Sequence, residues 1–498
     1  MIRYFTKRTK VIFCLLLFFY AYQAGGQTAH KDLIEAYNNV LDLRYRQEIP
    51  ALESFEYQSV HDQVFKLYIL NLKNVLDLLL VYQNDKYASY SAIERDHLKA
   101  LNDISRDDPF VEYVKIEFKV HRGLVKIMYG DRVSGAFNLI QAFRQLTDYE
   151  RKYAGYTYTL KISGLLNILL SLFPDRYDWV LKMLQVDPDF TKGLNYLKEL
   201  SGSDSVFKRE GILLYALSLS FYGSNPAESE KILNVHEKSF NNSLLYNYLE
   251  GLTSIKNRNN EAAIQAFDHC LEYGRDYLQI PALNYYRAEA YLKELNFNRA
   301  AYLYNHYLDI PDGGRFIKDS NYKLFNLSKL FSIPDDNFTA YREAVLTEGN
   351  LITGSDNYAY RRISRGYEPD STLFISRLLF DGGYYERSNQ ALSARSLNDY
   401  SNTEDRCEFL YRYARNFQMM NQVESAIDYF NQVLDIEGAE FYYFWGNSVL
   451  NLGNLYSKTG EYTLAREFYQ RALDYKGESY KNSIRAEARA GLKKIEQY

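Results

Sequence analysis

The feature that most constrains the fold of this chain is a pair of apolar helical faces separated by one short turn. Residues 450–475 read LNLGNLYSKTGEYTLAREFYQRALDY, with apolar side chains at helical spacing before and after the turn. Gly460 can adopt the positive φ that ends the first helix. Small residues at Gly453 and Ala465 allow the two helices to approach closely. The stretch therefore predicts a helical hairpin, and it offers no plausible catalytic group.

The same pattern recurs elsewhere in the chain. Small residues stand at the same two places in three further segments, as Ala414 and Ala426, Gly251 and Ala263, and Ala288 and Ala300. Two weaker copies align their second helix through Ala136 and Ser388. Because such hairpins bury their apolar faces by stacking on one another, this recurrence predicts an array over nearly the whole chain.

The hairpin at 450–475 resembles the tetratricopeptide repeat, a helix–turn–helix unit of about 34 residues. The resemblance implies an all-α fold, an α-solenoid of stacked hairpins whose first helices line a groove. Composition agrees, since 498 residues are too many for one compact core and no Pro/Gly/Ser-rich linker separates domains. Many of the 49 tyrosines recur at packing positions, which favours a structural role over an aromatic platform for sugars or bases.

The first 26 residues predict a secretory signal peptide. Four basic residues precede the apolar run VIFCLLLFFYAY, which is shorter than a membrane-spanning helix, and Ala24-Gly25-Gly26 supplies small residues at the cleavage spacing. We therefore expect a mature chain that begins at or near Gln27 and is exported to the periplasm or associated with the cell envelope. The alternative is an uncleaved anchor, which would make the protein a membrane-tethered regulator.

Residues 150–222 differ from the regular repeats and carry a second resemblance. A glycine-containing apolar helix, a stop at Ser171-Leu172 with Pro174, and a helix start at Asp189 with Gly193-Leu194 follow one another. In that order they are similar to the inclusion-body-clearance family of tetratricopeptide-repeat proteins, which implies an adaptor-like scaffold without enzyme activity. We expect divergent helical repeats over 27–222 and a regular solenoid with a C-terminal capping helix over 223–498.

Residues that could perform chemistry are sparse. The seven histidines include no pair at the i, i+4 spacing of a helical zinc site. Asp187, Asp189 and Thr191 have the offsets of a calcium loop, but Lys192 replaces the required glycine and Lys198 the bidentate Glu. A helix cap at Asp189 or Thr191 is the simpler interpretation. We expect no catalytic residue, no metal and no cofactor.

The expected function is a non-enzymatic scaffold that binds a protein or peptide in its groove. The alternative is an enzyme that uses the solenoid as a frame. Removal of the signal lowers the formal charge from −4 to −8, since the segment holds four basic and no acidic residues. This mild acidity argues against nucleic acid as the main partner, while envelope association stays open. The groove candidates are exposed-stripe positions of two neighbouring first helices: Tyr411, Arg412, Arg415, Asn451, Asn454 and Lys458.

Overall fold

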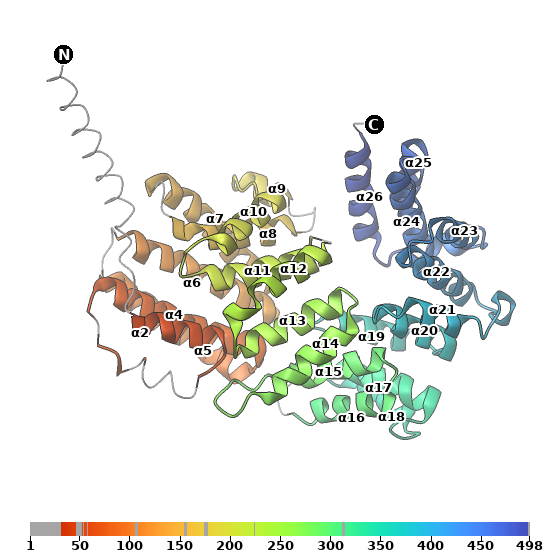
Figure 1. Ribbon diagram of the computed structural model, residues 1–498, viewed down its shortest axis with the longest axis horizontal. Helices are drawn as coiled ribbons and strands as arrows, with labels where there is room; N and C mark the ends of the chain where they lie inside the picture. The colour runs from red at the N-terminus through yellow and green to blue at the C-terminus, as the bar shows by residue number, and fades with distance from the viewer. Residues whose placement is uncertain are drawn as a thin grey trace, which may run out of the picture. The chain divides into compact units, whose positions relative to one another are not determined.

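Helices make up nearly all the secondary structure of the chain. The computed structural model describes residues 31–45, 52, 54–56, 58–104, 108–153, 157–173, 178–223, 225–310 and 314–496. Within these residues there are 24 α-helices, and one isolated bridge between Arg44 and Tyr277 is the only β-type pairing (Figure 1). The expected all-α solenoid of stacked hairpins is confirmed. The expected signal peptide, residues 1–26, lies outside the described residues.

The contacts divide the chain into two compact units. Unit 1 comprises residues 1–250 and 269–280, and unit 2 comprises residues 251–268 and 281–498. The chain passes between the units within α13 (Leu244–Lys256), within α14 (Asn260–His269) and again after Ile280. The sequence boundary at 222 separates divergent from regular repeats and stays a prediction about repeat type.

Consecutive helices of unit 1 pack as hairpins, and the first helix of one hairpin also contacts the first helix of the next. The short α9 interrupts the hairpin of α8 and α10. The helices are α2 (Lys31–Leu41), α4 (Val60–Leu80), α5 (Asn84–Ile104), α6 (Pro109–Met128), α7 (Arg132–Lys152), α8 (Leu160–Ser171), α9 (Asp178–Met183), α10 (Phe190–Gly202), α11 (Lys208–Phe221) and α12 (Pro226–His236).

Helix α2 packs on the face that the first helices of unit 1 form. Tyr37 is fully buried, packs against Phe65 and Phe207, and donates its hydroxyl to Glu210 of α11 at 2.5 Å. Asp42 just after α2 pairs with Arg209 of α11 at 2.5 Å. The backbone after α2 then hydrogen-bonds to residues 276 and 278. Helix α2 thus fills this part of the face.

Unit 2 continues the hairpins and ends in a capping helix, α26, that packs on α24 and α25. Its helices are α15 (Ala282–Lys293), α16 (Phe297–Leu308), α17 (Ile317–Phe331), α18 (Phe338–Thr347), α19 (Gly354–Ser364), α20 (Ser371–Asp381), α21 (Tyr385–Leu392), α22 (Thr403–Met419), α23 (Val423–Leu434), α24 (Tyr443–Thr459), α25 (Tyr462–Leu473) and α26 (Lys481–Ile495).

Three helices, α17 to α19, depart from the two-helix repeat. Helix α19 packs on both α17 and α18, and α15 contacts α20 directly. The sequence repeats gave no sign of this additional helix. Its consequence is local, since α19 places three polar side chains, Tyr358, Arg361 and Arg362, beside the first helices α20 and α22.

Close approach of the two helices explains the small residues of the hairpin at 450–475. Ala465 is fully buried, and a Cβ added to Gly453 would lie 2.7 Å from the Tyr469 ring. Gly460 has φ of 87° at the end of α24, which is the left-handed conformation that glycine adopts without strain. The predicted hairpin is confirmed.

The two weaker copies had different outcomes. Ser388 is buried and its hydroxyl lies 2.8 Å from that of Ser376 in the first helix, so this copy is confirmed. The alignment through Ala136 is wrong by one residue. Gly135 is the residue that meets the first helix, because its added Cβ would lie 2.7 Å from the Gly123 carbonyl oxygen. A neighbouring glycine and alanine are both small, so the sequence alone did not fix the register.

In the divergent middle of the chain, helices α8 and α10 pack closely at a pair of glycines. A Cβ on Gly193 of α10 would lie 2.8 Å from the carbonyl oxygen of Gly164 in α8. Asp189 caps α10 by accepting the Lys192 backbone N–H at 2.7 Å, and its own N–H donates to Asn167. The capping interpretation of the acidic string is therefore confirmed.

Candidate functional site

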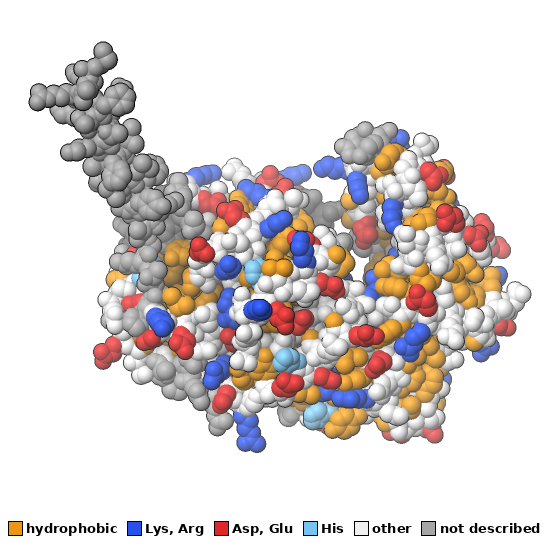
Figure 2. Space-filling model, in the orientation of Figure 1, with side chains coloured by type: hydrophobic (Ala, Val, Ile, Leu, Met, Phe, Trp, Pro, Cys, Tyr) orange, Lys and Arg blue, Asp and Glu red, His pale blue; other side chains and the backbone are white. Residues whose placement is uncertain are grey.

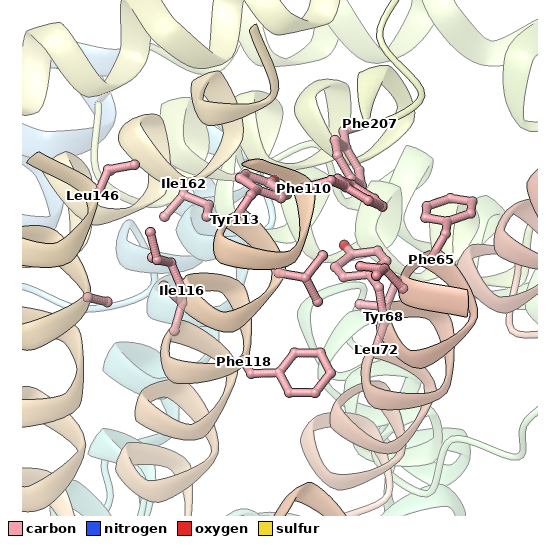
Figure 3. Packing of buried hydrophobic residues seen from close by; sticks show 14 of the residues in the cluster. Phe65, Tyr68, Leu72, Phe110, Tyr113, Ile116, Phe118, Leu146, Ile162 and Phe207 are labelled. Atoms are coloured by element: carbon pink, nitrogen blue, oxygen red, sulfur yellow. The ribbon is translucent and has the colours of Figure 1, made fainter. Parts of the chain in front are cut away.

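A buried ionic cluster joins the first helices of unit 1. Lys161 of α8 contacts Glu117 of α6 at 2.7 Å and Glu210 of α11 at 3.1 Å. Its ammonium also lies 2.5 Å from the hydroxyl of Tyr68 in α4. Tyr113 donates to Glu117 at 2.5 Å. Figure 3 shows Tyr68 and Tyr113 among the buried aromatic and aliphatic side chains of the unit 1 core.

The cluster is mostly buried, with the Lys161 side chain 3% and the Glu210 side chain 12% exposed, and it places two carboxylates around one ammonium. Burial lowers the pKa of Lys161, but Glu117 and Glu210 outweigh that effect and the net shift is upward. Burial, helped by the Lys161 charge, lowers the pKa of His121 to about 3. The His121 ring is therefore neutral, and its Nδ1 lies 2.7 Å from the Asn71 side-chain oxygen. Paired charges in such a buried network specify how the helices pack.

Unit 2 holds an open cavity on the corresponding face. On the side drawn in Figure 2, basic and acidic side chains are interspersed over the surface. Cationic side chains instead gather in a cavity of about 460 Å³, lined by α19, α20, α22 and α24 and by residues 479–480 before α26. Five arginines line it: Arg361, Arg362, Arg365, Arg377 and Arg412.

Three of these arginines already have partners. Arg362 donates to Glu404 at 2.7 Å and stacks over the Tyr367 ring at 3.7 Å from its centroid. Arg412 pairs with Glu408 at 2.7 Å. Arg377 donates to the Tyr358 hydroxyl at 2.7 Å and lies 3.8 Å from Asp381. These pairs hold the cavity floor in place.

The other two arginines form no ion pair within the described part of the chain. Arg361 donates only to the Asn357 carbonyl oxygen of its own helix, at 3.3 Å, and Arg365 lies exposed at the end of α19. They are about one helical turn apart along the same edge of the cavity. Both guanidinium groups are thus available to a ligand.

Tyrosines form the remaining walls. Burial raises the pKa of Tyr358, but the Arg377 and Arg362 charges outweigh burial and the net shift is downward. Tyr443 lies beside Tyr480, with ring centroids 5.5 Å apart. Among the described residues, neither of these two hydroxyl groups has a hydrogen-bond partner. The cavity therefore presents spare donors, both charged and neutral.

A smaller hollow of about 50 Å³ adjoins the cavity. The two share a wall of five side chains: Arg362, Tyr367, Arg377, Asp405 and Glu408. Beyond that wall the lining reaches Glu289 and Lys293 of α15 and Lys323 of α17. Polar side chains thus continue along unit 2 from α15 to the connection before α26.

Comparisons with known proteins agree with the helical hairpins. Residues 447–479 match the tetratricopeptide-repeat model, and residues 160–312 match the model described as Iml2/Tetratricopeptide repeat protein 39. The chain is a tetratricopeptide-repeat protein. It resembles the Iml2 family, as the motif order in residues 150–222 predicted. No curated protein sequence matches the chain.

Among solved structures, the tetratricopeptide-repeat protein is similar to the human IFIT1 dimer with m7Gppp-AAAA. The sequence identity is 14%, the match covers 90% of this chain and 96% of that chain, and the TM-score is 0.22.

The six predicted groove residues of this repeat protein do not all line the cavity. Arg412 lines the cavity but is 5% exposed and paired, and Tyr411, 7% exposed, packs against Phe430 and Phe444. The expectation that these positions are left free by packing is therefore wrong. Loss of the Arg412 side chain would also leave Glu408 without its buried partner.

The other four candidates lie outside the cavity lining. Arg415 donates to the buried Asn451 at 2.8 Å. Asn454 accepts the Tyr469 hydroxyl of α25, and Lys458 donates to Asn421 in the preceding turn. These hydrogen bonds link neighbouring helices and turns. Whether the four also bind a ligand stays a prediction.

Sequence reasoning missed most of the cavity. Arg361, Arg362 and Arg365 belong to α19, which lies outside the repeat register, and Tyr480 lies in the connection to the capping helix. The only available signal was local, the three arginines spaced over one turn in YRRISRGY. In the ionic cluster, Lys161 stood out as a lone charge within an apolar run.

Two further features of the described residues bear on function. No group of three or more His, Cys, Asp and Glu side chains there could hold a metal ion. Helices of the length and apolarity needed to cross a bilayer are also absent from that part of the chain.

Proposed function

We propose that this tetratricopeptide-repeat protein is a non-enzymatic scaffold that binds a protein or peptide segment in the cavity of unit 2. The observation that carries this proposal is the contrast between two faces of the same type. In unit 1 the first-helix face is filled by α2, whose Tyr37 is fully buried there. In unit 2 the first-helix face is open at a cavity of about 460 Å³. Concave faces of helical repeats are the usual binding surfaces of such proteins.

A blocking substitution tests this proposal. Ser479 lines the cavity and is half-buried, so Ser479→Trp places an indole in the space a ligand would occupy. Ser393→Trp, exposed at the end of α21 and outside the lining, is the matched control. Each variant is used to capture partners from the native envelope, and the captured proteins are quantified. Loss of partners with Ser479→Trp alone supports the proposal, and equal capture by all three proteins refutes it.

We also propose that the protein works outside the cytoplasm, in the periplasm or at the cell envelope. The support is the order of a basic start, a short apolar run and small residues in the first 26 residues. N-terminal sequencing of the native protein tests it, and a start at or near Gln27 is expected. Recovery of Met1 from a membrane fraction would instead favour the tethered regulator.

A further inference from the structure

We propose that the cavity of unit 2 selects an acidic peptide segment, whose carboxylates meet Arg361 and Arg365. This inference rests on the proposed function, since it names the kind of segment that the scaffold binds. Three independent observations support it: the balance of charge, the unused hydrogen-bond donors and the occupant of the corresponding face in unit 1.

The balance of charge in the cavity is positive. Five arginines face four carboxylates in the lining. Glu404 and Glu408 are already neutralised by lining arginines, and Glu368 pairs with Lys329 and Arg342 from outside the lining. Asp405 is the remaining acid, and Asn402 donates to it at 2.6 Å. Arg361 and Arg365 thus stand without a countercharge, and a ligand carboxylate would supply one.

The unused hydrogen-bonding capacity also favours an acceptor ligand. A guanidinium group carries donors only, and its fork matches a carboxylate. The Tyr443 and Tyr480 hydroxyls, which have no partner in the described part of the chain, can donate as well. Aspartate and glutamate side chains, and backbone carbonyl groups beside them, present acceptors to all four groups.

The occupied face of unit 1 shows the same chemistry in use. There α2 is followed by Asp42, which pairs with Arg209 of α11, while the Arg209 guanidinium lies 4.6 Å from the Phe240 ring centroid. In unit 2, Arg362 is stacked on Tyr367 in a comparable way. A carboxylate paired with an arginine that lies over an aromatic ring, as Asp42 pairs with Arg209, is therefore an arrangement that this chain already uses.

The test measures binding of capped synthetic peptides to the full chain. An alternating Glu-Tyr peptide is compared with Gln-Tyr and Lys-Tyr peptides, and a Gln-Tyr peptide with a free C-terminus separates a terminal carboxylate from side-chain carboxylates. We expect the Glu-Tyr peptide to bind best, with affinity that falls as salt rises. Arg361→Gln with Arg365→Gln should weaken it by about tenfold or more. Arg395→Gln with Arg466→Gln, both exposed and outside the lining, removes equal charge and should leave it unchanged.

The outcomes separate the two proposals. If Ser479→Trp abolishes partner capture but the Glu-Tyr and Gln-Tyr peptides bind equally, the acidic preference is wrong and the scaffold function stands. Tightest binding by the Lys-Tyr peptide, or by the peptide with the free C-terminus alone, also overturns the inference. If Ser479→Trp still captures every partner, the proposed scaffold function itself is refuted.

Discussion

At the residue scale, the His121 ring in unit 1 links stability to pH. Burial and the Lys161 charge hold its folded-state pKa at about 3, well below the unfolded value of about 6.5. The folded state therefore binds fewer protons than the unfolded state between these values. The stabilisation is complete above pH 6.5 and is lost as the pH falls towards 3, by about 1.4 kcal/mol for each pH unit.

The prediction is that His121→Gln flattens this dependence. The amide of Gln can still donate to Asn71, and it does not titrate. Urea unfolding of wild type and variant at pH 7.5, 6.5, 5.5 and 5.0 gives the difference in unfolding free energy at each pH. The wild type should lose stability relative to the variant only below about pH 6.5, where its unfolded state takes up a proton on His121. A constant difference over the whole series would contradict the assignment.

The packing of Ala465 gives a second prediction at this scale. Its side chain is fully buried against the first helix of its hairpin, so Ala465→Leu should overpack the contact and cost about 1–3 kcal/mol. Ala490 of α26 is exposed, and Ala490→Leu should change stability by less than about 0.5 kcal/mol. Thermal midpoints of the two variants check this. Equal midpoints for Ala465→Leu and wild type would contradict the observed register.

At the element scale, the glycine pair in α8 and α10 sets how closely two helices approach. Gly193→Ala brings a Cβ within 2.8 Å of the Gly164 carbonyl oxygen, a backbone atom that cannot rotate away. We expect a loss of about 1–3 kcal/mol. At Gly202, at the end of α10, an added Cβ meets nothing within 4 Å. Gly202→Ala should be neutral or stabilising, and chemical denaturation of both variants makes the comparison.

The same elements show how far the sequence predicts this fold. Hairpins were predictable because close packing demands small residues at fixed places, as at Gly453 and Ala465. Helix α19 was not, since its segment repeats nothing. The cavity was mostly missed for the same reason. The Lys161 cluster was missed because Glu117 and Glu210 look like solvated charges until the fold brings them together.

At the scale of the whole molecule, the thiols report on both folding and processing. Cys270 and Cys407 are buried thiols outside any disulfide, and burial raises the pKa of Cys407 to about 12. Thiol titration of the folded protein should therefore be slow, because the thiolate is the reactive form. After unfolding, two thiols should react if the signal has been removed with Cys14, and a third indicates retention. Rapid reaction in the folded state would contradict the burial.

Because α2 contacts α11, unit 1 can be completed only after α11 has been synthesised. Tyr37 and its partner Glu210 are 173 residues apart, so α2 leaves the ribosome long before α11 does. At about 5–20 residues per second, the delay is roughly 10–35 s. Throughout that interval α2 can pack on α4, where Tyr37 meets Phe65 and Tyr68, but it lacks its contacts with α11. A nascent chain therefore cannot form the Tyr37–Glu210 and Asp42–Arg209 contacts of α2 until α11 has been made.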